Sequence, residues 1–151
     1  MTIHWCGTGL SAIPGLRRLI KAGHDVVVWN RTVNKARESV GDITQTLRMF
    51  DKDILRSDLS AGDVVVSMLP GEWHVPLAEL AISKGAHFVS SSYIAPEMRA
   101  LDARAKQAGL VLINEVGLDP GIDHLMAHKL IEDYRTSDAN TSENALSFQS
   151  Y

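Results

Sequence analysis

The regular alternation of short apolar runs with helical patterns is the feature that most constrains the fold of this chain. The apolar runs are residues 2–6, 25–30, 42–47, 63–69, 87–92 and 110–114. Helical spacing of apolar residues, or a glycine that ends a helix, marks most of the segments between them. The strands are predicted as apolar runs rather than alternating ones, with residues 42–47 as a weaker strand, as expected when helices cover both faces of the sheet. The sequence therefore predicts an α/β domain with a doubly wound parallel sheet of about six strands.

A glycine-rich turn directly after the first apolar run indicates a ligand site. The stretch GTGLSA, residues 7–12, matches the pattern G-x-G-x-x-A between a strand and a helix. Gly7 permits the tight turn, Gly9 lets the backbone approach a pyrophosphate, and Ala12 allows the helix to pack closely on the sheet. The start of the helix offers unpaired N–H groups and a partial positive charge to phosphate. The motif predicts a dinucleotide site in a Rossmann-type NAD(P)-binding fold, against the alternative of a glycine turn made only for packing.

The end of the second apolar run bears on the choice of cofactor. The stretch WNRT, residues 29–32, lies about 20 residues further on, where NAD-binding folds usually carry an acidic residue for the ribose hydroxyl. No acidic residue is present, and the planar fork of Arg31 suits a 2′-phosphate. Asn30 and Thr32 add neutral hydrogen-bonding groups. NADP is therefore favoured over NAD, and the alternative is a solvated loop arginine.

The stretch NEVGLDPGIDHL, residues 114–125, leaves the last apolar run and then resumes a helical pattern. Asp119 is predicted to cap that helix, with Pro120 at its first position. The same turn lies at the carboxyl edge of the sheet, where open α/β sheets bind ligands. Asp119 is therefore interpreted as a cap that also faces the ligand.

The stretch SMLPGEWH, residues 67–74, follows the fourth apolar run and reaches the same edge. The backbone from Met68 to Pro70 is a candidate lining of the cofactor site. Trp73 and His74 are candidates to face the crevice, although an aromatic residue packed under a loop and an ordinary histidine at a helix start are the simpler interpretations.

Composition excludes several classes of protein. The net charge of −3 and the scattered basic residues predict no nucleic-acid partner. No apolar run approaches a membrane span, so no membrane association is predicted. The single cysteine, Cys6, is expected to be a small core residue. Because no internal disulfide can form from one cysteine, a cytoplasmic location is expected. His124 and His128 have a spacing that can chelate a metal, but no third ligand stands out and no metal site is predicted.

Five stretches together resemble the saccharopine dehydrogenase family of the NADP-dependent, L-glutamate-forming type. They are GTGLSAIP, NRT, DVVVSMLP, VSSSYIAPEM and NEVGLDPGIDHLMAHKLIED. The resemblance implies an NADP-dependent oxidoreductase of lysine metabolism that acts on a CH–NH bond. 2-Aminoadipate 6-semialdehyde and glutamate condense to an imine, NADPH delivers a hydride, and saccharopine forms. Carboxynorspermidine, homospermidine or opine-type enzymes share parts of these motifs and remain alternatives, as does a non-catalytic NADP(H)-sensing module.

The resemblance also implies roles for individual residues. The residues implied to bind NADP are Gly7, Thr8, Gly9, Leu10, Ser11, Asn30, Arg31, Thr32, Met68, Ser91, Leu118, Asp119 and Pro120. Ser92, Tyr93 and Asp119 are implied to face an amino-acid substrate, with Tyr93 and Asp119 as the catalytic candidates. The complete acid–base set is unknown, because the family's second domain supplies most of the substrate pocket.

Domain boundaries follow from composition. Residues 1–135 are expected to form the NADP-binding domain. Residues 136–151 become polar and then end in ALSFQSY, which looks like the first strand of the family's second domain. A homodimer of the full-length protein is left open as a further expectation.

Overall fold

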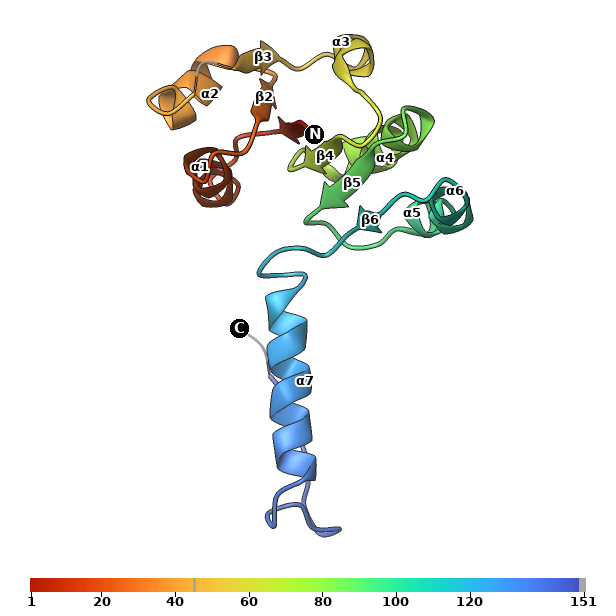
Figure 1. Cartoon of the computed structure of the whole chain (residues 1–151). Helices are drawn as coiled ribbons and strands as arrows, with labels where there is room; N and C mark the ends of the chain where they lie inside the picture. The colour runs from red at the N-terminus through yellow and green to blue at the C-terminus, as the bar shows by residue number, and fades with distance from the viewer. Residues whose placement is uncertain (45, 150–151) are drawn as a thin grey trace.

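The computed structural model describes residues 1–44 and 46–149, which contain a six-stranded parallel sheet (Figure 1). The strands are β1 (Ile3–Cys6), β2 (Val26–Asn30), β3 (Leu47–Met49), β4 (Val64–Ser67), β5 (His87–Ser90) and β6 (Leu112–Ile113). Their order across the sheet is β3-β2-β1-β4-β5-β6. The order reverses between β1 and β4, which defines the switch point of a doubly wound sheet. The predicted fold class is confirmed.

Helices follow the strands as the sequence predicts, with two differences. The helices are α1 (Ile13–Lys21), α2 (Val33–Val40), α3 (Lys52–Asp58), the 3₁₀ turn η1 (Gly71–Trp73), α4 (His74–Ser83), α5 (Pro96–Arg99), α6 (Asp102–Gln107) and α7 (Ile122–Arg135). The segment from Leu10 to Ala12 is a turn, so α1 begins later than predicted. The helix predicted for residues 96–108 is divided into α5 and α6, because Leu101 N–H bonds to the carbonyl of Met98 and tightens the chain there.

Alternate side chains of β1 enter two separate cores. Ile3 and Trp5 pack with α1 and α2 on one face of the sheet. Cys6 packs with α3 and α4 on the other face, where its side chain is fully buried. This alternation follows from the two-residue period of a strand. The prediction that Cys6 is a core residue is confirmed, and burial raises the pKa of its thiol above the ordinary value.

The third strand lies later in the chain than predicted. The sequence places it at residues 42–47, whereas β3 begins at Leu47. The N–H groups of Ile43 and Thr44 both bond to the carbonyl of Val40, so the chain turns at the end of α2 before it can pair. Pairing begins where the N–H of Val28 donates to the carbonyl of Thr46. Gln45, part of the predicted strand, is outside the described residues.

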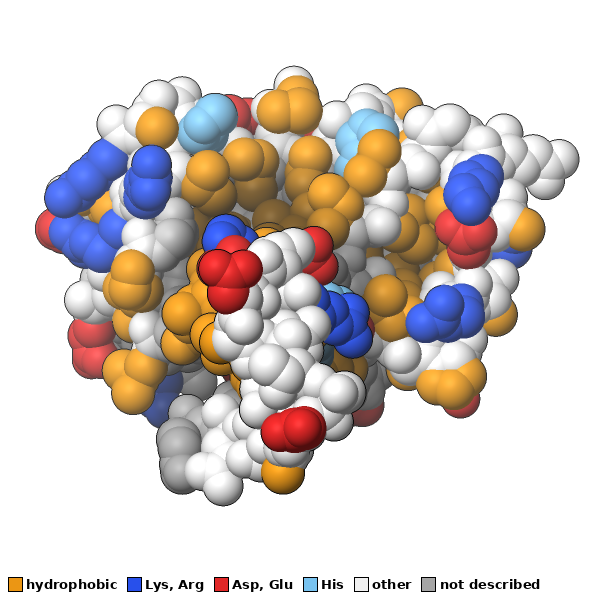
Figure 2. Space-filling model, turned by 90° about the horizontal axis from the view of Figure 1, so that it is seen from below, with side chains coloured by type: hydrophobic (Ala, Val, Ile, Leu, Met, Phe, Trp, Pro, Cys, Tyr) orange, Lys and Arg blue, Asp and Glu red, His pale blue; other side chains and the backbone are white. Residues whose placement is uncertain are grey.

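Helix α7 projects away from the sheet, and the described part of the chain after it runs back along the helix (Figure 1). The predicted helical face at Leu125, Met126 and Leu130 exists, but these side chains are between 60% and 70% exposed. Hydrophobic side chains gather beside the helix in the view from below (Figure 2). Residues 145–149 of the predicted final strand form no strand, and residues 150–151 are outside the described residues. None of the described helices has the length and apolar character that spanning a membrane requires.

Candidate functional site

Two cavities lie side by side at the carboxyl ends of the central strands. The Arg31 cavity has a volume of about 570 Å³ and is lined by Gly7, Thr8, Gly9, Asn30, Arg31, Thr32, Lys35, Phe50, Asp51, Lys52, Met68, Leu69, Pro70, Glu72 and Trp73. The Trp5 cavity has a volume of about 480 Å³ and is lined by Trp5, Ser11, Ala12, Gly15, Leu19, Val66, Met68, Val89, Ser90, Ser91, Val116, Gly117, Leu118 and Asp119. Met68, just after β4, lines both cavities. The two cavities therefore adjoin at Met68, next to the switch point.

The glycine turn after β1 has the geometry that the motif predicts. Gly7 has a φ of +104°, and a Cβ atom there would lie 2.7 Å from the carbonyl oxygen of Met68. Only glycine satisfies both the left-handed conformation and this close approach. A Cβ atom at Gly9 would meet nothing within 4 Å, so the space beside this residue is open. The turn leaves room for a ligand where a pyrophosphate is expected.

The charged groups of the Arg31 cavity favour an anionic ligand. Arg31, Lys35 and Lys52 supply three positive charges, against two negative charges from Asp51 and Glu72. One oxygen of Asp51 already accepts N–H bonds from the first turn of α3. Within the described ranges 1–44 and 46–149, the guanidinium of Arg31 has no hydrogen-bond or ion-pair partner. It is therefore available to a ligand in the cavity.

An aromatic pair forms one side of the Arg31 cavity. Phe50 and Trp73 pack edge to face with their ring centroids 5.1 Å apart. Near the glycine turn, the side-chain amide of Asn30 donates to the hydroxyl of Thr8. The sequence motifs identified Thr8, Asn30 and Arg31 but missed Phe50. Phe50 follows β3, whose position was predicted wrongly, so no motif pointed to it.

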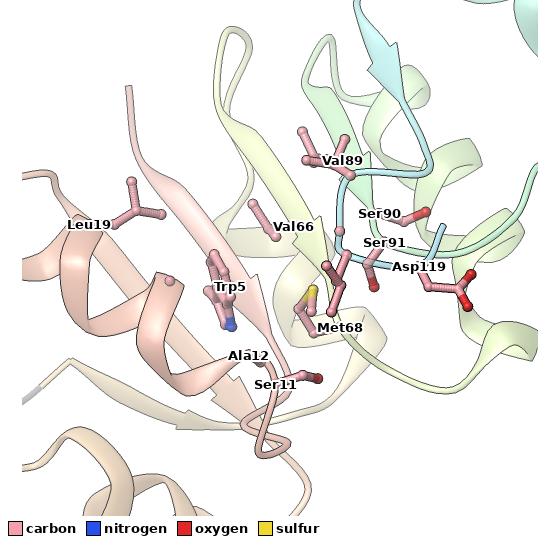
Figure 3. Close-up of a pocket in the computed structure, with 14 residues that line it drawn as sticks. Trp5, Ser11, Ala12, Leu19, Val66, Met68, Val89, Ser90, Ser91 and Asp119 are labelled. Carbon is pink, nitrogen blue, oxygen red and sulfur yellow. The ribbon is translucent and has the colours of Figure 1, made fainter. Parts of the chain in front are cut away.

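The Trp5 cavity is apolar at one end and polar at the other. Trp5, Leu19 and Val66 form the apolar end, and Ser90, Ser91 and Asp119 lie at the opposite end (Figure 3). The indole N–H of Trp5 donates to the carbonyl of Gly7 at 2.9 Å, which ties this side chain to the glycine turn. The motifs did not identify Trp5, because within the first apolar run it reads as an ordinary core residue.

Most of the predicted site residues border the two cavities. Those that do are Gly7, Thr8, Gly9, Ser11, Asn30, Arg31, Thr32, Met68, Ser91, Leu118 and Asp119. Leu10 is 91% exposed and lines neither cavity. Pro120 is buried, and Ser92 and Tyr93 lie on the segment after Ser91 without lining either cavity.

Tyr93 and Asp119 contact each other directly. The hydroxyl of Tyr93 donates to a carboxylate oxygen of Asp119 at 2.6 Å. This hydrogen bond is the main cause that raises the pKa of Tyr93 above its ordinary value, with smaller contributions from nearby carboxylates. Tyr93 therefore stays protonated at neutral pH. The structure brings together the two catalytic candidates of the sequence, at the polar end of the Trp5 cavity.

The predicted capping role of Asp119 is wrong. Helix α7 begins at Ile122, and Gly121 occupies the N-cap position with a φ of +144°. A Cβ atom at Gly121 would lie 2.5 Å from the carbonyl oxygen of Gly117, so this turn requires glycine and the helix begins only after it. The Asp119–Pro120 peptide bond is cis, and Pro120 is not in the helix. The carboxylate of Asp119 is thus free of any capping bond to α7.

His74 is buried, whereas the sequence left open whether it faces the crevice or is an ordinary histidine at a helix start. It begins α4 and is only 5% exposed. Its Nδ1 atom lies 2.9 Å from the hydroxyl oxygen of Ser67, and its Nε2 atom lies 2.7 Å from that of Ser92. Burial lowers the pKa of His74, and the nearby Glu72 opposes that shift. His74 therefore joins the end of β4 to the segment after β5.

The two histidines of α7 do not belong to a metal cluster among the described residues. His124 Nδ1 lies 2.9 Å from the carboxylate of Asp123, and its ring meets that of Tyr93 edge on with centroids 6.4 Å apart. His128 lines a separate open cavity together with Glu115.

Comparison with known proteins places this site in one family. A family model described as "Saccharopine dehydrogenase NADP binding domain" matches residues 3–113. The chain is 37% identical over 131 residues to the NADP-dependent, L-glutamate-forming saccharopine dehydrogenase of Pyricularia oryzae, a match that covers 84% of this chain and 29% of that protein. It is 38% identical over 112 residues to the alpha-aminoadipic semialdehyde synthase of Arabidopsis thaliana, a match that covers 72% of this chain and 10% of that protein.

Solved structures give the same result. The apo saccharopine dehydrogenase (L-Glu forming) of Saccharomyces cerevisiae matches 89% of this chain and 31% of its own, with a TM-score of 0.75 and 33% identity. An oxidoreductase from Klebsiella pneumoniae matches 89% of the chain with a TM-score of 0.63 at 23% identity, which supports the fold alone. The chain spans less than a third of the length of the two saccharopine dehydrogenases that it matches.

Proposed function

Because the chain belongs to the family of saccharopine dehydrogenase NADP binding domains, we propose that it supplies the cofactor half of an enzyme that reduces an imine between an aldehyde and an amino acid. NADP(H) is the cofactor of this family. The proposed reaction is the formation of saccharopine from 2-aminoadipate 6-semialdehyde and glutamate, in lysine metabolism. The relatives named for this activity support the reaction.

The observation that carries the proposal is the positive charge of the Arg31 cavity and its position beside the Trp5 cavity. In this assignment the Arg31 cavity holds the adenosine end of NADPH, with Arg31 at the 2′-phosphate and the pyrophosphate beside Gly9. The open space at Gly9 and the guanidinium of Arg31, which is unpaired within the described part of the chain, fit such a group. The residues of the Trp5 cavity, beyond Met68, would then hold the nicotinamide end, which would supply a hydride to the substrate carbon.

The polar end of the Trp5 cavity is the proposed substrate side. Asp119 is exposed and accepts the hydroxyl of Tyr93, so its carboxyl group is suited to orient a cationic amino group. Tyr93 fixes the direction of that carboxylate and holds its own proton. Ser92 and Tyr93 face the substrate in this proposal, and the remaining acid–base groups come from outside the chain.

Binding of NADPH and of NADH to the chain tests the cofactor assignment. Calorimetric titration of residues 1–151 is expected to give tighter binding of NADPH, and equal affinities would contradict the placement of Arg31. Saccharopine-dependent reduction of NADP⁺ by a protein that contains this domain and the substrate domain tests the reaction. Turnover of a polyamine-forming imine, without turnover of saccharopine, would replace the proposed substrate.

A further inference from the structure

His74 lies between the hydroxyl groups of two serines, one at the end of β4 and one in the segment after β5. Ser67 is the last residue of β4 and is fully buried, whereas Ser92 is half-buried. The ring of His74 reaches Ser67 with Nδ1 and Ser92 with Nε2. A neutral histidine donates from one ring nitrogen and accepts at the other, so the two serines must play opposite roles.

The buried serine decides which nitrogen carries the proton. The hydroxyl of Ser67 has no other hydrogen-bond partner among the described residues, and water does not reach it. If Nδ1 carried the proton, the hydroxyl hydrogen of Ser67 would be buried without an acceptor, which typically costs about 1–3 kcal/mol. Ser67 therefore donates to Nδ1. The proton of His74 then resides on Nε2, which donates to the hydroxyl oxygen of Ser92.

This direction leaves the hydroxyl hydrogen of Ser92 without a partner in the described part of the chain. The backbone around Ser92 is also fixed, because its carbonyl accepts the N–H of Glu115. The carboxylate of Glu115 accepts the N–H of Ile94. Tyr93 is therefore held between two anchored neighbours, and it extends from there to Asp119.

We propose that His74 is a positioning residue that fixes the segment carrying Tyr93 and turns the hydroxyl hydrogen of Ser92 outward, as a donor to a carboxylate of the substrate. The identity of the ligand, a carboxylate of the substrate, rests on the proposed function. The directions of the hydrogen bonds do not rest on it, because the contacts of His74 with Ser67 and Ser92 set them. Both contacts of the His74 ring are with side chains, that of Ser67 at the end of β4 and that of Ser92 after β5.

The position of the proton on His74 is measured by long-range ¹H–¹⁵N correlation NMR of the 151-residue chain, at a pH where the ring is neutral. The proton is expected on Nε2, and a proton on Nδ1 would overturn the inference. In Ser67→Ala, Nδ1 loses its donor, so the preference for Nε2 is expected to weaken or reverse. An unchanged preference in Ser67→Ala would show that Ser67 does not set the direction.

The positioning role is measured through the pKa of the Tyr93 hydroxyl, followed by NMR. In His74→Leu the segment loses its anchor, and the pKa is expected to fall toward the ordinary tyrosine value. His74→Gln, whose amide both donates and accepts, is expected to restore the raised pKa. If His74→Leu does not fold, Ser92→Ala removes the same hydrogen bond from its other end.

A raised pKa that persists without the hydrogen bond would refute the positioning role. Titration of the wild-type chain with NADPH is a separate measurement. Failure of that titration would count against the proposed function and leave the assignment of His74 unaffected.

Discussion

The hydroxyl of Tyr93 donates to the carboxylate of Asp119 across 2.6 Å, although the two residues are 26 positions apart in the chain. Tyr93 follows β5, and Asp119 lies in the turn before α7. The bond therefore joins the segments that follow the neighbouring strands β5 and β6, at the carboxyl edge of the sheet. Both side chains are exposed, so the bond is made at the rim of the site and not in the core.

Asp119→Asn tests this bond. The change removes the negative charge and weakens the hydrogen bond, so the pKa of Tyr93 is expected to fall toward its ordinary value. The free energy of unfolding is expected to stay within about 0.5 kcal/mol, as for most exposed positions. NMR titration of the Tyr93 ring measures the shift. Asp133→Asn, near the end of α7, is the matched control, and an equal shift in that variant would assign the effect to general charge.

The same Asp119→Asn variant tests catalysis in a protein that also contains the substrate domain. Since Asp119 does not cap α7, loss of turnover in a folded variant would come from the ligand side. We expect turnover to fall at least about tenfold, the loss of roughly 1.4 kcal/mol of transition-state stabilisation. Normal turnover would remove Asp119 from the proposed site.

The two glycines of the turn after β1 are expected to fail in different ways. Gly7→Ala places a Cβ atom 2.7 Å from the carbonyl oxygen of Met68 at a left-handed φ, so it should cost about 1–3 kcal/mol of stability. Gly9→Ala enters open space and should change stability by no more than about 0.5 kcal/mol. It should still weaken NADPH binding at least about tenfold, about 1.4 kcal/mol, by occupying the space beside the pyrophosphate. Chemical denaturation and calorimetry measure the two effects. Intact NADPH affinity in Gly9→Ala would move the pyrophosphate away from this turn.

Cofactor preference is expected to depend on Arg31. A hydrogen bond to a charged group is typically worth about 1.5–3 kcal/mol, so the preference for NADPH over NADH should be on the order of tenfold to a hundredfold. Arg31→Ala should remove most of this preference while weakening NADH binding little. Arg18→Ala, on the exposed side of α1, is the control for loss of a positive charge. If Arg31→Ala weakened both cofactors equally, Lys35 and Lys52 would become the candidates for the phosphate contact.

The stability of the fold is expected to fall in mild acid because of His4. Its Nδ1 atom accepts the indole N–H of Trp29 at 3.2 Å, and its Nε2 atom lies 3.5 Å from a carboxylate oxygen of Asp63 with no regular hydrogen bond among the described residues. Burial lowers the pKa of His4 below 6.5, although Asp63, Asp58 and Asp25 oppose the shift. As the pH falls below the unfolded value, the unfolded chain binds a proton that the folded chain does not. The free energy of unfolding therefore falls through that window and is highest above it.

Denaturation with urea, repeated from about pH 8 to about pH 5, measures this dependence. His4→Asn keeps an acceptor for Trp29 and removes the titrating group, so its stability should fall less over the same range. Buried His74 contributes in the same direction, and some decline should remain. His24→Asn, at an exposed position, is the control. A decline in His4→Asn as steep as in the wild type would exclude His4 as the cause.

The sequence predicted the central strands well and the edge of the sheet less well. β1, β2 and β4 are buried on both faces, so the need for apolar residues at every position makes them visible as continuous runs. β3 has three residues, of which none is buried, and its apolar content therefore carries no signal. Phe50 was missed for the same reason, because its place in the Arg31 cavity follows from where β3 ends.

The motifs also predicted the glycine turn, because its backbone geometry requires glycine at a fixed position after β1. Arg31 lines the cavity beside this turn, and its contact with a phosphate stays a prediction. The hydrogen bonds of His74 were not predictable in this way. They join Ser67, His74 and Ser92 across two strands, and only the tertiary structure brings these side chains together. For Asp119 the sequence predicted a helix cap that the structure does not contain. The conformation of Gly121 places the start of α7 at Ile122, beyond the reach of an Asp119 cap.

The order of the sheet has a consequence for synthesis of the chain. β1 is made first, yet it lies at the centre of the sheet and pairs with β2 on one side and β4 on the other. During synthesis, β4 becomes available to pair with β1 only after residues 64–67 have been translated. Until then one edge of β1 presents unpaired backbone groups, and such an edge readily pairs with other chains. Nascent chains that end before β4 are therefore expected to be the species that most need a chaperone.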